Sequence, residues 1–126
     1  MINQASIGMI SILHACQKYN IQKLVVCSSG SNIIGTAWKR KSGESCYSEK
    51  DYTVDHQWDE LDGYMKSKVR QEEEIRQWIK ENECCTEIVT LHPTFTVGPT
   101  LTKYKTSNIE AFRKIISGEI PAVPQL

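Results

Sequence analysis

Two short apolar runs, each placed between longer amphipathic segments, constrain the fold of this chain more than any other feature. The runs are Leu24-Val25-Val26-Cys27 and Ile88-Val89-Thr90-Leu91. Runs of this length, rich in β-branched residues and bounded by polar ones, are typical of parallel strands that are buried on both faces. We therefore expect strands over residues 23–28 and 86–92, the second of which ends before Pro93.

Three helices are expected to alternate with these strands. Apolar residues recur at steps of three and four over 5–19, and Asn20 follows as a stop signal. A second helix is expected over 62–83 and a third over 107–116. The candidate caps of the second helix are Asp59 and Asp62, and its apolar stripe consists of Leu61, Met65, Ile75 and Ile79. The order helix-strand-helix-strand-helix predicts an α/β fold with right-handed crossovers.

Two parallel strands do not form a stable sheet by themselves, because parallel sheets need more strands and cover on both faces. The sequence is therefore expected to be part of a larger domain, or to need another chain to complete it. The polar connection over 29–59 is long for a compact domain, so we expect it to be functional or partly ordered by short elements.

Charge and cysteine content exclude several classes of function. Fifteen basic residues balance fifteen acidic ones, which argues against a nucleic-acid or anionic-membrane surface. No apolar run approaches the roughly 20 residues of a membrane span, and residues 7–16 lack the features of a signal peptide. Zinc would require Cys84, Cys85 and His92, which lie on elements that do not converge. The five cysteines are expected to be reduced and mostly buried, in a cytoplasmic protein.

Tyr64 and Lys68 are four positions apart on the expected helix over 62–83, so their side chains lie on one helix face. An ammonium beside a phenol favours the phenolate and lowers a pKa that is about 10 when unperturbed. Such a phenol can exchange a proton with a carbonyl or alcohol oxygen. The same spacing also suits a surface helix with a half-buried tyrosine. Tyr19 and Lys23 share the spacing but straddle a helix end, so they are not expected to share a face.

Polar or restrained residues follow both expected strands. Ser28, Ser29 and Gly30 follow the first, and the segment His-Pro-Thr-Phe-Thr-Val-Gly-Pro over 92–99 follows the second. The carboxyl ends of strands line the ligand crevice in open α/β sheets. A serine hydroxyl there can bind the oxygen that Tyr64 protonates, and the segment over 92–99 can present backbone groups to a ligand. A plain turn and a plain loop remain the alternatives.

Four ordered segments carry a resemblance to a known family. They are Gly8-Met9-x-x-Ile12-Leu13, Lys23-Leu24-Val25-Val26-Cys27-Ser28-Ser29, Tyr64-Met65-Lys66-Ser67-Lys68 followed by Glu72, and Leu91-His92-Pro93-x-x-x-Val97-Gly98-Pro99. In this order they resemble the middle of an extended short-chain dehydrogenase/reductase, of the NAD(P)-dependent epimerase/dehydratase superfamily. Residues 51–58 and Trp78 resemble its dihydroflavonol-4-reductase-like branch, and residues 107–124 resemble the start of its substrate-binding part.

The resemblance implies a fold, an activity and a division of the chain. The fold would be a partial Rossmann-type doubly wound parallel sheet. Residues 1–105 would be the C-terminal half of the NAD(P)-binding domain, and residues 106–126 would begin the substrate-binding region. The activity would be hydride transfer between NAD or NADP and a small-molecule carbonyl or alcohol carbon.

The resemblance also implies roles for single residues. Tyr64 would be the catalytic acid/base, and Lys68 would lower its pKa and bind the nicotinamide ribose. Ser29, rather than Ser28, would polarise the substrate carbonyl. The residues implied to bind the cofactor are Tyr64, Lys68, Pro93, Thr94 and Val97.

The chain departs from the family at the pyrophosphate loop. The seven glycines give no Gly-x-x-Gly-x-x-Gly turn after a strand, and the residue that selects NAD or NADP is absent as well. We therefore expect the chain to lack the N-terminal dinucleotide-binding half, to bind the cofactor weakly and to show no turnover alone.

Two other interpretations stay open. Many family members dimerise by packing two long helices, which here match residues 5–19 and 62–83, into a four-helix bundle. A non-enzymatic module can use these helices to form a homodimer, or a heterodimer with a full-length relative. A gene remnant or an incomplete gene model is the second interpretation.

Overall fold

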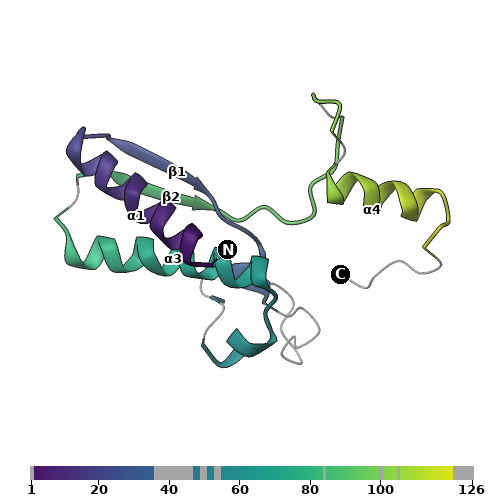
Figure 1. The fold of residues 1–126 in the computed structure, drawn as a ribbon, viewed down its shortest axis with the longest axis horizontal. Coiled ribbons are helices and arrows are strands. Elements are labelled where there is room, and N and C mark those ends of the chain that lie inside the picture. The colour runs from purple at the N-terminus through teal and green to yellow at the C-terminus, as the bar shows by residue number, and fades with distance from the viewer. Residues whose placement is uncertain are drawn as a thin grey trace. The chain divides into compact units, whose positions relative to one another are not determined.

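The structure, a computed structural model, divides into two compact units, Met1–Pro93 and Thr94–Leu126, each of which is described by itself. It describes residues 2–35, 47–48, 51–52, 55–83, 85–99, 101–104 and 106–120. The elements of the first unit are, in chain order, α1 (Ile2–Lys18), β1 (Lys23–Cys27), α2 (Ser31–Ile34), η2 (Asp55–Glu60), α3 (Gly63–Glu81) and β2 (Glu87–Leu91), and the second unit contains α4 (Ser107–Ile116) (Figure 1).

The two strands form a parallel pair, in which Leu24 lies opposite Ile88 and Val26 lies opposite Thr90. In Figure 1 the strands run side by side and in the same direction. The α/β class, the parallel pairing and the alternation of helices with strands are thus confirmed for the residues that the structure describes. They are consistent with a partial Rossmann-type fold.

The hydrophobic core lies between the two long helices and one face of the sheet. Helix α1 packs against α3, and the core consists of Met9, Leu13, Val26, Ile75 and Trp78, against which Leu24 and Ile88 pack. Leu13 is 1% exposed, and burying a leucine side chain contributes about 1.5–3 kcal/mol. This layer of side chains holds α3, and every functional group on it, against β1 and β2.

The opposite face of the sheet is uncovered, so the expectation of strands buried on both faces is wrong for the described part of the chain. Val25 is 55% exposed and Leu91 is 53% exposed. Neighbouring side chains of a strand point to opposite faces of the sheet. Because α1 and α3 both pack against the face of Leu24 and Val26, the face of Val25 is left without a covering helix in the described part of the chain.

The expectation of mostly buried thiols is also wrong for the cysteines that the structure describes. Cys16 is buried in the core side of α1, but Cys27 and Cys85 are exposed. Cys27 alternates with Val26 along β1 and therefore lies on the uncovered face of the sheet. Cys46 and Cys84 lie outside the described residues.

The helix ends follow the local signals of the sequence. Asn20 has a positive φ of 51°, as expected for the residue that stops α1. Of the two candidate caps, Asp62 is the N-cap of α3, and its carboxylate accepts from the Met65 N–H at 2.8 Å. The expected apolar stripe of α3 is wrong at Ile79, which is 53% exposed, because the helix instead turns Trp78 into the core.

The polar connection over 29–59 contains short elements, α2 and the beginning of η2, as expected. In the second unit, α4 begins after Thr106, whose hydroxyl accepts from the Ile109 N–H at 3.5 Å. The unit boundary at 93/94 precedes the predicted domain boundary at 105/106, and the assignment of the two parts to a cofactor domain and a substrate region stays a prediction. Among the described helices, none is long and apolar enough to cross a membrane.

Candidate functional site

Helix α3 presents four polar side chains at steps of one turn toward the carboxyl ends of the strands. These residues are Tyr64, Lys68, Glu72 and Arg76. A spacing of four places them in one row along the helix surface. Exposure changes along this row, because Tyr64 is 54% exposed whereas Glu72 is 3% exposed. The row thus runs from a solvent-accessible phenol through a buried carboxylate to the exposed guanidinium of Arg76.

Lys68 joins the tyrosine to the end of β1. Its Nζ lies 6.0 Å from the centroid of the Tyr64 ring and donates to the carbonyl oxygen of Cys27 at 3.0 Å. This contact occupies one of the three ammonium N–H groups, and the other two form no hydrogen bond with the part of the chain that the structure describes. The pair Tyr19 and Lys23 behaves differently, because Lys23 forms an ion pair with Glu87 at 3.0 Å across the strands.

The two serines that follow β1 have different partners. The Ser28 hydroxyl donates to the Glu72 carboxylate at 3.0 Å and accepts from the Asn32 amide at 2.8 Å, so its proton is used within the protein. Ser29 Oγ instead accepts from the N–H of Ser31 at 3.3 Å and from its hydroxyl at 2.9 Å. Within the described residues Ser29 Oγ donates to no other group, and an uncommitted hydroxyl proton is the property that a carbonyl-polarising group needs.

The turn that carries these serines is attached to the end of β2. The Ser28 N–H donates to the Leu91 carbonyl at 2.8 Å, and the Gly30 N–H donates to the Pro93 carbonyl at 2.9 Å. These bonds extend the parallel pairing beyond the last residues of the strands. The first residues after β1 and after β2 are thereby held next to each other.

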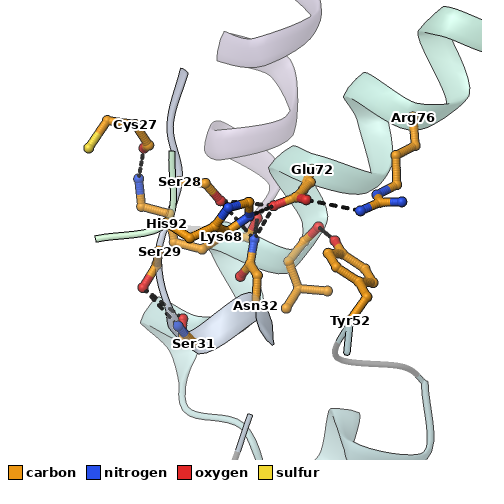
Figure 2. A network of polar contacts seen from close by, with 11 residues as sticks. Cys27, Ser28, Ser29, Ser31, Asn32, Tyr52, Lys68, Glu72, Arg76 and His92 are labelled. Carbon is orange, nitrogen blue, oxygen red and sulfur yellow. Dashed lines mark hydrogen bonds and ion pairs between the residues drawn. The ribbon is translucent and has the colours of Figure 1, made fainter. Parts of the chain in front are cut away.

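Glu72 is the centre of a buried polar network (Figure 2). Its Oε2 lies 2.8 Å from Asn32 Nδ2 and 2.8 Å from His92 Nε2, and it also accepts from Ser28. Its Oε1 pairs with Arg76 at 3.2 Å. Burial acts to raise the pKa of the Glu72 carboxyl, but the hydrogen bonds from Asn32, His92 and Ser28 outweigh it and hold that pKa below its usual value. Glu72 is consequently ionised near neutral pH.

A pocket of about 420 Å³ adjoins this network, and it is lined by Ile33, Tyr52, Glu72, Arg76, Thr90, Leu91 and His92. The Arg76 guanidinium lies 4.2 Å from the centroid of the Tyr52 ring, and the Tyr52 hydroxyl donates to the Val69 carbonyl at 3.2 Å. Burial, followed by the negative charge of Glu72, raises the pKa of the Tyr52 phenol well above its ordinary value. Tyr52 is therefore a neutral hydrogen-bond donor on this side of α3.

The structure brings together part of the predicted set of site residues. Lys68 lies beside Tyr64 and contacts the residue that precedes Ser28 and Ser29. Pro93 belongs to the same unit, where its carbonyl is bound to the turn after β1. Thr94 and Val97 belong to the second unit and are described only within it; the Thr94 carbonyl accepts from the Thr96 hydroxyl at 3.2 Å.

Sequence reasoning missed Asn32, placed His92 in the ligand-facing segment over 92–99 without a role for its side chain, and gave Glu72 no role. Asn32 is fully buried, and its amide also donates to the Lys68 carbonyl at 3.1 Å. The spacing of Lys68 and Glu72 by one turn was the available signal for the carboxylate. No local pattern marks Asn32 as part of the site, because two of its partners, the Lys68 carbonyl and Glu72, are 36 and 40 positions away along the chain. In the described residues no group of three or more His, Cys, Asp or Glu side chains is placed to hold a metal ion.

Comparison with known proteins shows the family to which the chain belongs. The model of the NAD dependent epimerase/dehydratase family matches residues 1–123, so the chain belongs to that family. A Schizosaccharomyces pombe protein named as a putative uncharacterized oxidoreductase is 29% identical to this chain over an alignment of 139 residues, gaps included. The alignment covers 98% of this chain and 40% of that relative. The chain thus spans about 40% of the length of the curated relative that it matches.

Proposed function

We propose that these residues are the catalytic part of an oxidoreductase that transfers hydride between NAD or NADP and the carbonyl or alcohol carbon of a small molecule. Membership of the family supports the class of reaction. The single observation that carries the proposal is the position of the Lys68 ammonium, which lies between the Tyr64 ring and the last carbonyl of β1. The finer assignment to a dihydroflavonol-4-reductase-like branch is part of the same proposal.

The proposed chemistry assigns one proton task to each side chain. In the reducing direction, Tyr64 donates its phenolic proton to the substrate oxygen, and in the oxidising direction its phenolate accepts that proton. The positive charge of Lys68 stabilises the phenolate. The free proton of Ser29 donates a hydrogen bond to the same substrate oxygen and polarises the carbonyl. A nicotinamide cofactor held beside these residues would supply or accept the hydride.

The residues of the chain fit one end of the cofactor. Lys68 has two N–H groups beyond the bond to Cys27, which suits the two hydroxyls of the nicotinamide ribose, and the neighbouring Tyr64 is exposed. Pro93, whose carbonyl is bound to the turn after β1, is proposed to approach the nicotinamide ring. The pyrophosphate has no corresponding glycine-rich cradle in the 126 residues. We therefore propose that the chain by itself binds the nicotinamide end weakly and turns over no substrate.

Saturation-transfer NMR with NADH tests this proposal on the 126-residue chain. We expect nicotinamide and ribose protons to receive saturation from the protein more strongly than adenine protons do. Lys68→Met should abolish this transfer. Lys66→Met is the matched control, because Lys66 lies on the same helix but is directed to the Trp58 ring, 5.5 Å from its centroid.

Two results would contradict the proposal. One is saturation of the adenine protons alone, and the other is equal transfer in the Lys68→Met and Lys66→Met variants. Oxidation of NADPH or NADH with simple aldehydes and ketones by the isolated chain would contradict the narrower statement that the chain lacks turnover.

A second candidate function is favoured by the outer surfaces of the long helices. Ile7 is 65% exposed and Ile12 is 46% exposed on α1, and Ile79 is 53% exposed on α3. A groove of about 570 Å³ lies between the start of α1 and α3, lined by Ile2, Asn3, Ser6, Ile7, Trp58, Arg70 and Glu74. These exposed side chains of the long helices are available for contact with a partner. We propose that the segments over 5–19 and 62–83 pair with a second copy of the chain or with a relative.

A further inference from the structure

We propose that Glu72 is a positioning residue, whose buried carboxylate holds the turn over residues 28–32 so that Ser29 is aimed at the substrate oxygen, beside the pair of Tyr64 and Lys68. The inference rests on the proposed function for the roles of Ser29 and Lys68. It adds a group that does not itself touch substrate or cofactor and that acts through the backbone of the turn.

The carboxylate of Glu72 joins three other segments of the chain. Glu72 Oε2 contacts Ser28 at the end of β1, Asn32 in α2 and His92 at the end of β2 (Figure 2). Each contact is 3.0 Å or shorter. The carboxylate is 3% exposed, so these bonds form away from competing water and are expected to be strong.

The same network reaches Lys68. Asn32 Nδ2 contacts Glu72 and also donates to the Lys68 backbone carbonyl at 3.1 Å. The Lys68 side chain in turn contacts the Cys27 carbonyl. The turn after β1 is therefore bound to α3 at the level of the proposed catalytic lysine, and the position of Ser29 relative to Lys68 depends on these bonds.

The alternative to a positioning role is that the Glu72 network only stabilises the fold. Taking a carboxylate out of water is expensive, and apolar replacements of similar volume are often neutral or stabilising. Among the described residues, the groups that face Glu72 are the His92 ring and the Arg76 guanidinium, and the neutral Tyr52 phenol lines the adjoining pocket. A network of this kind gives a defined geometry to three converging segments, which an apolar cluster would not specify.

The experiment compares Glu72→Gln with three other variants in the 126-residue chain. Glu72→Asp keeps the charge, and Glu81→Gln alters an exposed glutamate that only accepts from Gln77 at 2.7 Å on the same helix. Ile75→Val is a destabilised control, because it removes one methylene from the core next to Glu72 without touching the network. Amide hydrogen exchange measures the order of the turn, and saturation-transfer NMR with NADH measures binding at the nicotinamide end.

We expect Glu72→Gln to raise exchange at the Gly30 and Asn32 backbone amides about tenfold relative to Val26, since the side chains of Ser28, Asn32 and His92 lose the charged carboxylate that ties the turn to α3. We expect its NADH affinity to fall about tenfold, and Glu72→Asp to recover part of both effects. Glu81→Gln should change neither, and Ile75→Val should leave the affinity of the folded protein unchanged.

Two results would overturn the proposed role of Glu72, and a third would separate it from the proposed function. Unchanged exchange at Gly30 and Asn32 overturns the proposal. An affinity loss no larger than that of Ile75→Val also overturns it, because a merely structural role would then suffice. If the wild-type chain does not bind NADH, the proposed function fails, and the exchange arm alone still decides whether Glu72 orders the turn.

Discussion

The ammonium of Lys68 donates to the carbonyl oxygen of Cys27 at 3.0 Å, and this bond joins the middle of α3 to the last residue of β1. The two residues are 41 positions apart in the chain. The bond places a positive charge at the carboxyl end of the strand, one residue before the serine pair. This single relationship explains why a tyrosine on α3 and a serine after β1 are candidates for one reaction.

The first prediction separates the two serines by stability. Ser28→Ala should lower the free energy of unfolding by about 1–3 kcal/mol, because it leaves the Asn32 amide and the Glu72 carboxylate short of a buried partner. Ser29→Ala should cost less, since Ser29 mainly accepts from Ser31 within the same turn. Urea denaturation monitored by tryptophan fluorescence measures both values. A larger loss for Ser29→Ala would show that the assigned partners are wrong.

The fold was predictable from the sequence because its signals are local. The helix expected over 107–116 has those bounds in the structure, and the strands expected over 23–28 and 86–92 end within one residue of their predicted limits. Apolar periodicity, Asn20 and Asp62 supply this information without any tertiary contact. What a local pattern could not show is which sheet faces the chain itself covers, so the exposure of Val25 was not foreseen.

The candidate site was predictable only where its members share a helix. Tyr64 and Lys68 are one turn apart, and their common face follows from helix geometry. The Glu72 network depends instead on Ser28, Asn32 and His92, which are 44, 40 and 20 positions from the carboxylate. A buried carboxylate also runs against the general rule that glutamate stays exposed. Only the folded chain shows that hydrogen bonds from Ser28, Asn32 and His92 offset the cost of burying the ionised carboxylate.

The second prediction concerns the pH dependence of stability that Glu72 creates. Its pKa in the folded state is lowered from 4.5, so the stability it contributes is present above about pH 4.5 and is lost as the pH falls through the folded-state pKa. At pH 7, Glu72→Gln should lower the free energy of unfolding by about 1–3 kcal/mol. The difference between wild type and variant should shrink below about pH 4.5.

Urea denaturation of both proteins over this pH range provides the measurement. Glu81→Gln is the control, and its difference from wild type should stay within about 0.5 kcal/mol at neutral pH. A Glu72→Gln effect of constant size from neutral to acidic pH would mean that the ionised carboxylate is not the stabilising form.

The third prediction tests the one-sided sheet. Val25→Thr should change the free energy of unfolding of the chain by no more than about 0.5 kcal/mol, because Val25 lies on the uncovered face. Val26→Ala should cost about 1.6 kcal/mol or more, since two methyl groups leave a buried position next to Leu13 and Ile75. Thermal and urea unfolding of the two variants give the comparison. Equal losses would show that a further layer covers the Val25 face in solution.

The fourth prediction addresses self-association through the long helices. If the segments over 5–19 and 62–83 pair with a second copy, replacing the exposed Ile7 and Ile12 together by glutamate should shift the chain from dimer to monomer, because two charges would be buried at the interface. Sedimentation equilibrium at several protein concentrations measures the dissociation constant, which we expect to rise at least about 100-fold. Val25→Glu is the matched control, since it adds a charge to the sheet face and not to the helices. A monomeric wild type at high concentration, or equal weakening by the Val25 variant, would exclude these helices as the self-association surface and leave pairing with a relative to be tested by co-purification.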